Sequence, residues 1–189
     1  MSAQDSKLFV ISGPSGAGKG TLVTRVRERR SNLGLTVSAT TRAPRKGEVD
    51  GVNYFFLTRE EFDRRVANGE FVEWAEVHGN CYGTLVSEVQ SKLASGSSLI
   101  LEIDVQGALQ VKERFPEAVL IFIKPPSLEV LRERLVGRGT ETPETIELRM
   151  ANAAHELALA DRYDDVVVND DLDRATDELV RVLDMNERI

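Results

Sequence analysis

A glycine-rich segment near the start of the chain carries the residues whose chemistry is easiest to infer. Gly13-Pro14-Ser15-Gly16-Ala17-Gly18-Lys19-Gly20-Thr21 directly follows a short apolar run, Leu8-Phe9-Val10-Ile11. Glycines let the backbone curl so that successive N–H groups point inward, and the start of the following helix adds positive potential. A lysine in this place reaches the outer phosphates of a nucleotide. The segment therefore predicts a phosphate-binding loop for a nucleoside triphosphate, formed by Ser15, Gly16, Ala17, Gly18, Lys19, Gly20 and Thr21.

One position of this loop departs from the usual pattern. The Ser or Thr that normally follows the lysine is Gly20, and the hydroxyl comes one place later, at Thr21. We therefore expect Mg²⁺ to be held mainly by water and by the nucleotide's phosphates, which its reluctance to lose water permits. The loop alone fits a motor, a GTPase switch or a kinase.

The elements that must position the loop follow from the apolar pattern. Short apolar runs alternate with longer amphipathic stretches, which predicts an α/β fold with a mainly parallel sheet in a three-layer core. Thr58 with Glu61, and Thr142 with Pro143, are signals for helix starts. We expect strands at about 8–11, 54–57, 71–77, 98–103, 118–123 and 166–168. We expect helices at about 19–30, 58–68, 85–94, 127–137, 142–160 and 172–186.

We interpret the chain, 1–189, as a single domain with two insertions on one core. The core would comprise 1–34, 96–137 and 161–189. The segment at about 35–95 interrupts the alternation with β-rich sequence, and the segment at about 138–160 would be a short lid.

The composition limits the classes of function. The 24 Lys and Arg against 31 Asp and Glu give a net charge of −7, which disfavours a partner such as nucleic acid or an anionic membrane. The apolar run at 118–123 is too short to cross a bilayer, and residues 1–5 lack the pattern of a signal peptide. The single cysteine, Cys81, allows no internal disulfide, so we expect a cytoplasmic protein. Its oligomeric state is unknown from the sequence.

Further motifs follow the loop in a fixed order, and with it they make the sequence resemble the guanylate kinase family from about Leu8 to Leu183. The resemblance implies transfer of a phosphoryl group from ATP to GMP, and also to dGMP, giving ADP and GDP with Mg²⁺. The motifs are Val37-Ser38-Ala39-Thr40-Thr41-Arg42-Ala43-Pro44-Arg45 with Gly47-Glu48 and Gly51, Tyr54-Phe55-Phe56, Glu73-Trp74-Ala75, Tyr82-Gly83-Thr84, Glu102-Ile103-Asp104-Val105-Gln106-Gly107, Gly137-Arg138-Gly139-Thr140-Glu141 and Val168-Asn169-Asp170-Asp171.

The resemblance implies that the first insertion binds GMP. Arg42, Arg45, Tyr54 and Tyr82 would hold its phosphate, because a dianion needs several convergent donors. Without the resemblance, composition alone would favour a solvated basic turn before Lys46.

Ser38, Glu73 and Thr84 are implied to read the guanine. A carboxylate such as Glu73 can accept hydrogen bonds from guanine N1–H and from its exocyclic amine. Adenine lacks both donors, so the same carboxylate would remain buried and unpaired. The residue pattern alone would instead favour a Glu73 that faces water, since it lies on a strand with Phe71 and Ala75 as alternate residues.

The strand at 98–103 ends near two carboxylates. The resemblance places Asp104 on the GMP side, and Glu102 would position Mg²⁺ through water. Carboxyl ends of parallel strands face the ligand crevice, which agrees with both roles. Both residues could instead only cap the next helix.

Arginines beside the lid are implied to act on the ATP phosphates. Arg134, Arg138 and Arg149 would join Lys19 and Arg42 as the catalytic cations, with surface ion pairs as their alternative role. Asn169 corresponds to a position that contacts adenine, although it could also cap a turn.

Two other functions remain open from the sequence. Gly18-Lys19-Gly20-Thr21 also resembles the loop of adenylate kinases, against which Glu73 and the segment from Ser38 to Arg45 argue. A non-catalytic guanylate-kinase-like module that binds phosphopeptides is the second, which the intact Lys19 disfavours. We also expect Trp74 to pack in the core of the GMP-binding region.

Overall fold

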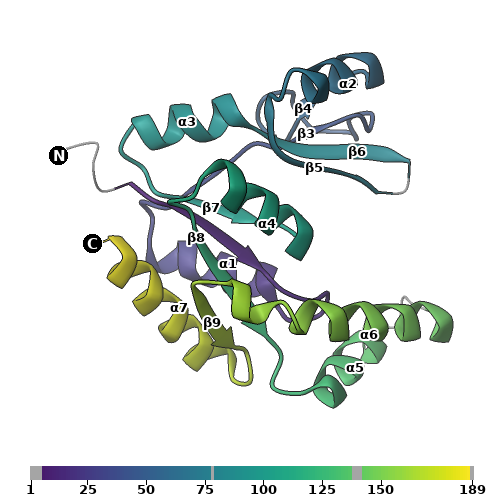
Figure 1. The fold of residues 1–189 in the computed structure, drawn as a ribbon, viewed down its shortest axis with the longest axis vertical. Coiled ribbons are helices and arrows are strands. Elements are labelled where there is room, and N and C mark those ends of the chain that lie inside the picture. The colour runs from purple at the N-terminus through teal and green to yellow at the C-terminus, as the bar shows by residue number, and fades with distance from the viewer. Residues whose placement is uncertain (1–5, 78, 138–141, 188–189) are drawn as a thin grey trace.

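The main sheet of the protein contains five parallel strands in the order β2-β7-β1-β8-β9. This computed structural model describes residues 6–77, 79–137 and 142–187. Figure 1 shows the sheet between two groups of helices, as the α/β pattern of the sequence predicts. The strands are β1 (Leu8–Ser12), β2 (Gly34–Leu35), β7 (Leu99–Glu102), β8 (Val119–Lys124) and β9 (Asp165–Val168).

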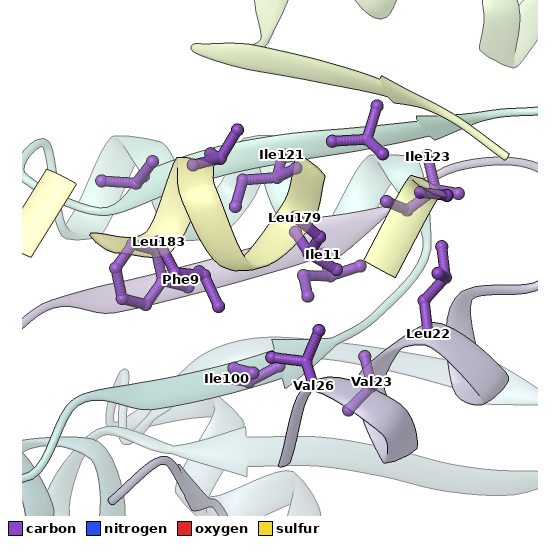
Figure 2. Packing of buried hydrophobic residues seen from close by; sticks show 14 of the residues in the cluster. Phe9, Ile11, Leu22, Val23, Val26, Ile100, Ile121, Ile123, Leu179 and Leu183 are labelled. Carbon is purple, nitrogen blue, oxygen red and sulfur yellow. The ribbon is translucent and has the colours of Figure 1, made fainter. Parts of the chain in front are cut away.

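Alternate residues of the central strands supply the cores on the two faces of this sheet. Phe9 and Ile11 of β1 face α1 (Lys19–Arg29) and α7 (Leu172–Glu187), and Figure 2 shows this packing. Leu8 and Val10 lie in the opposite core, which α3 (Val86–Ala94) and α4 (Val105–Arg114) cover. Both faces are buried, which is why β1 and β8 are continuously apolar in sequence.

A second sheet, in the order β4-β3-β6-β5, carries α2 (Arg59–Ala67). Its small core includes Phe62 of α2, which stacks on Phe71 at a ring-centroid distance of 4.3 Å. The next residue, Val72, packs into the core beneath α4, so β5 joins the two cores. The strands are β3 (Ala39–Thr40), β4 (Phe55–Phe56), β5 (Phe71–Val77) and β6 (Asn80–Leu85).

Two helices, α5 (Leu128–Gly137) and α6 (Pro143–Leu157), pack against each other at the lower right of Figure 1, away from the second sheet. The end of α6 packs on the core beneath α4 through Leu157. Leu131 and Leu135 of α5 contact Ala153 of α6. The Thr142 hydroxyl caps α6 by accepting a hydrogen bond from the Thr145 N–H, as its sequence signal predicts. A 3₁₀ turn, η1 (Ala160–Arg162), then leads to β9.

The expected strands and helices all occur, with shifts at their ends: α6 stops at Leu157 and β4 is only two residues long. We did not predict β2, β3 and β6. For α4, the sequence analysis named no range and mentioned only a next helix that Glu102 or Asp104 could cap. These short or mixed strands lack a clean alternation, because their pairing partners rather than their own sequence stabilise them. The boundaries of core, insertion and lid stay an interpretation.

The prediction that Trp74 packs in the core of the first insertion is wrong. It is 42% exposed and contacts Phe62 only edge-on, at 6.3 Å between ring centroids, so it lies at the rim of the second core.

Candidate active site

The glycine-rich loop joins β1 to α1 as predicted. Gly13 has a φ of 142° and lies against β8, where a Cβ atom would come within 2.2 Å of the Ile123 carbonyl oxygen. Only glycine fits such a position. Lys19 Nζ lies over the loop and donates to the carbonyls of Gly13 (2.6 Å) and Pro14 (3.1 Å). A loop with its lysine folded over it is suited to a polyphosphate.

Three predicted residues surround this loop. Arg149 of α6 donates to Ser15 Oγ at 2.5 Å. Asn169, which follows β9, donates its side-chain amide to the Ala17 carbonyl at 2.7 Å, and Arg134 of α5 donates to the Asn169 carbonyl at 2.8 Å. The structure therefore brings Arg134, Arg149 and Asn169 to the loop, whereas Arg138 lies outside the described residues.

A cationic corner forms in the loop between β3 and β4. The Arg42 guanidinium donates two hydrogen bonds to the Glu48 carboxylate, from Nη1 at 3.0 Å and from Nη2 at 2.9 Å. It lies 5.4 Å from the centre of the Tyr54 ring. The Arg45 backbone N–H donates to the same carboxylate at 2.7 Å, while its side chain is exposed. The hydrogen bond from Arg42 lowers the pKa of Glu48. Tyr82 lies edge-on to Tyr54, at 6.3 Å between ring centroids, so the predicted phosphate-binding residues share one corner.

Glu73 is half-buried and does not simply face water. Its Oε1 accepts a hydrogen bond of 2.7 Å from Thr84 Oγ1 on the paired strand, and Thr84 is 1% exposed. An irregularity in β5 between Phe71 and Glu73 breaks the simple alternation, so both Val72 and Glu73 face α4. Burial raises the pKa of Glu73, against the opposing effect of the hydrogen bond from Thr84.

Three further carboxylates, those of Glu102, Asp104 and Glu156, lie near the phosphate loop and the start of α4. Glu102 lies beside the start of α1, where a Cβ atom on Gly20 would be 3.4 Å from its Oε1. Asp104 caps α4 through the Gly107 N–H at 2.7 Å, which is the capping role left open above. Loss of hydration raises the pKa of Glu102 and of Glu156 on α6, while the charge of Lys19 acts in the opposite direction on both.

One pocket lies between the phosphate loop and the second sheet, and another lies between the start of α4 and the end of α6. One is lined by Gly20 of the loop together with Ser38, Thr84 and Glu102. The other is lined by Asp104 and by Asn152 and Glu156 of α6. The first pocket therefore brings Gly20, which is expected on the triphosphate, together with Ser38 and Thr84, which are expected on the guanine.

Comparison with known proteins adds an independent observation. The sequence model of the guanylate kinase family matches residues 5–186. The chain is 57% identical over 178 residues to a guanylate kinase of Gloeobacter violaceus, covering 94% of this chain and 87% of that protein. It is 52% identical over 183 residues to one of Halalkalibacterium halodurans, covering 97% of this chain and 90% of that protein.

The chain belongs to the guanylate kinase family. A crystal structure of guanylate kinase from Anaplasma phagocytophilum is similar in fold as well, with a TM-score of 0.73 and 36% sequence identity. The match covers 97% of this chain and 87% of that one.

Two carboxylates of this guanylate kinase site were missed by the sequence analysis. Glu48 orders Arg42 and the Arg45 backbone. Glu156 lines a pocket with Asp104, and the charge of Lys19 acts on its pKa. Glu48 lies within a family motif, where an acid between basic residues could have indicated an ion pair. Glu156 has no comparable signal in sequence, because α6 reaches the loop only in the folded chain. Among the described residues, no helix combines the length and apolar character needed to cross a membrane.

Proposed function

We propose that this chain transfers the γ-phosphoryl group of ATP to GMP, and also to dGMP, giving ADP and GDP. An oxygen of the GMP phosphate attacks the γ-phosphorus, and the bond from that phosphorus to the oxygen of the leaving ADP breaks. Membership of the guanylate kinase family supports the reaction. The observation that carries the choice of acceptor is the half-buried Glu73 carboxylate, which is hydrogen-bonded to the buried Thr84.

Glu73 supports guanine for a physical reason. Its Oε1 already accepts from Thr84, and a carboxylate has further lone pairs for the N1–H and amine donors of guanine. Adenine presents an acceptor at N1 and has no 2-amino group, so it would leave this half-buried carboxylate with Thr84 as a donor but without donors from the base. Sites of this kind can reject an analogue by roughly 10⁴-fold or more. Ser38 and Asp104 would complete the guanine side.

Arg42, Arg45, Tyr54 and Tyr82 would bind the acceptor phosphate. Glu48 holds Arg42 by two hydrogen bonds, which leaves the remaining N–H groups of the guanidinium in a fixed direction. A preorganised cation loses less entropy when a substrate binds.

Ser15 to Thr21 would bind the triphosphate of ATP, and Lys19, Arg134, Arg138 and Arg149 would neutralise charge that spreads over the transferring group. No side chain has to act as a nucleophile, since alignment of two bound nucleotides supplies much of the rate enhancement. We assign the segment at about 138–160 as the lid that excludes water.

Mg²⁺, bound together with ATP, would neutralise charge on the phosphates. Within residues 6–77, 79–137 and 142–187, no cluster of three or more His, Cys, Asp or Glu side chains could hold a metal ion by itself. Glu102 beside the start of α1 fits a role through bound water.

The buried, free Cys81 is compatible with a reducing cytoplasm.

Production of ADP from ATP with GMP, AMP, UMP or CMP tests the proposed function. We expect GMP to be preferred; a preference for AMP would make the chain an adenylate-type kinase. Tight binding of a phosphopeptide without any ADP formation would favour the non-catalytic module.

Lys19→Ala tests the role of the loop in the same assay. We expect kcat to fall by roughly 10²–10³, because one preorganised donor to the phosphates is lost. Arg181→Ala, an exposed cation on α7, is the matched control and should keep the rate of the unaltered chain. An unchanged kcat in Lys19→Ala would refute the role of Lys19.

A further inference from the structure

Asn169 makes hydrogen bonds to three elements around the predicted ATP site: β8, α5 and the phosphate loop. Its backbone N–H donates to the Lys124 carbonyl at the end of β8 (2.8 Å), and its own carbonyl accepts from Arg134 of α5 (2.8 Å). Its side-chain amide donates to the carbonyl of Ala17, at 2.7 Å, in the middle of the phosphate loop. Asn169 is only 5% exposed, and Ala17 is fully buried.

From this geometry we propose that the Asn169 side chain is a positioning residue of the phosphate loop, which acts on ATP through the Ala17–Gly18 peptide. The inference rests on the proposed function only in taking the triphosphate as the ligand of the loop. It differs from the role implied by family resemblance, in which Asn169 contacts adenine.

Peptide geometry explains how one hydrogen bond could orient the loop. A trans peptide is planar, with its C=O and N–H on opposite sides, and the described residues contain no cis bond. The Ala17 carbonyl points at Asn169, so the Gly18 N–H points away from it. The amide thereby selects the direction of one N–H that would bind the triphosphate.

The identity of residue 18 fits the same contact. Gly18 has a φ of 90°, and a Cβ atom at this position would lie 2.4 Å from the Asn169 amide nitrogen. A larger residue would therefore push the asparagine out of its place. Glycine at this point serves both the left-handed backbone and the close approach of the amide.

Asn169→Asp separates the two roles because it changes the donor and keeps an acceptor. The carboxylate that this substitution introduces could still accept from the amino group of adenine, but it would repel the Ala17 carbonyl. Positioning of the loop therefore predicts that Asn169→Asp binds ATP more weakly than Asn169→Ala, which only lacks the donor. Contact with adenine predicts the opposite order.

The experiment is calorimetric titration of each variant with ATP, inosine triphosphate and GMP. Inosine triphosphate has an oxygen where ATP has its amino group. We expect Asn169→Ala to weaken ATP and inosine triphosphate by the same factor, about tenfold for one lost buried hydrogen bond. Asn169→Asp should weaken both further, with GMP binding within twofold of the unaltered chain. Loss confined to ATP, or ATP binding by Asn169→Asp at full strength, would overturn the proposal.

Two controls keep a folding defect apart from the proposed effect. Asn186→Ala on α7 removes another amide that donates to a backbone carbonyl, that of Val182 at 2.9 Å, far from the loop. It should lower the melting temperature without changing either triphosphate affinity. In the unaltered chain, the Asn169 side-chain amide protons should exchange slowly with solvent before any nucleotide is added. Fast exchange would contradict the hydrogen bond to Ala17 even if the variants did not fold.

The proposed function can fail independently of this inference. Absence of ADP from ATP and GMP in the unaltered chain would refute the phosphotransfer. The comparison of ATP with inosine triphosphate measures binding alone, so it would still test Asn169.

Discussion

The ionised form of Glu73 is expected to lower the stability of the protein and also to be the form that binds guanine. In the folded chain its pKa is raised above the ordinary value of a glutamate by burial. Protonation of Glu73 therefore favours folding, and its contribution to stability is fully present below the unfolded pKa and is lost as the pH rises through the higher folded pKa. The ionised form that destabilises the fold is the form that would accept hydrogen bonds from guanine.

Glu73→Gln is accordingly expected to be more stable than the unaltered chain at neutral pH. The difference should shrink as the pH falls below the raised pKa, because Glu73 is then protonated. The same variant should raise KM for GMP roughly 10- to 100-fold, the value of a good bidentate contact to a base. Thermal melts between pH 4 and 8, with GMP kinetics at pH 7.5, measure both effects.

Glu113→Gln serves as the control for this pair of measurements, since Glu113 is exposed on α4. It should change neither the pH dependence nor KM. Equal stability of Glu73→Gln and the unaltered chain at every pH would show that Glu73 is not buried as a charge.

Among the secondary-structure elements, α2 depends on its cap. The Thr58 hydroxyl accepts from the Glu61 N–H at 3.2 Å, and α2 places Phe62 in the core of the second sheet. Loss of an N-cap costs about 1 kcal/mol. In a chain of this size, Thr58→Ala should therefore lower the melting temperature by about 2–4 °C.

Thr24→Ala gives a matched comparison for the cap. Thr24 is exposed within α1, and its hydroxyl bonds back to the Gly20 carbonyl, which adds little to a helix. Alanine is a better helix former, so this variant should keep or slightly raise the melting temperature. Equal losses in the two variants would mean that the cap of α2 contributes nothing.

In the molecule as a whole, the two sheets are expected to unfold together. Phe71 and Val72 are neighbours in β5 but lie in different cores, and Arg114 of α4 donates to the Gly69 carbonyl at 2.6 Å. These links make separate melting of the second sheet unfavourable. A ligand bound to that sheet should then stabilise the entire chain.

GMP at about 100 times its dissociation constant should stabilise the protein by about 2.7 kcal/mol, or about 5–10 °C in melting temperature. Trp74, the single tryptophan, reports on the second sheet, while far-UV circular dichroism reports on all helices. Both signals should shift equally with GMP, and AMP at the same concentration should shift neither. A lower transition of Trp74 that alone responds to GMP would show that the second sheet unfolds separately.

Local patterns of the sequence were sufficient for much of this protein. Glycine spacing predicts the loop, apolar runs predict β1 and β8, and Thr58 and Thr142 mark their helices, because each signal depends on neighbours within a few residues. The family motifs extended this to the fold and the reaction, while the roles of individual residues stay predictions.

Tertiary structure decided what the local pattern left open. Glu73 points inward because β6 supplies Thr84 as its partner and because β5 is irregular, neither of which strand periodicity reveals. Asn169 reaches Ala17 across 152 positions of sequence, and Arg149 reaches Ser15 only once α6 lies beside the loop. Such contacts depend on how distant elements pack, so their energies are set by the folded chain and not by any short segment of it.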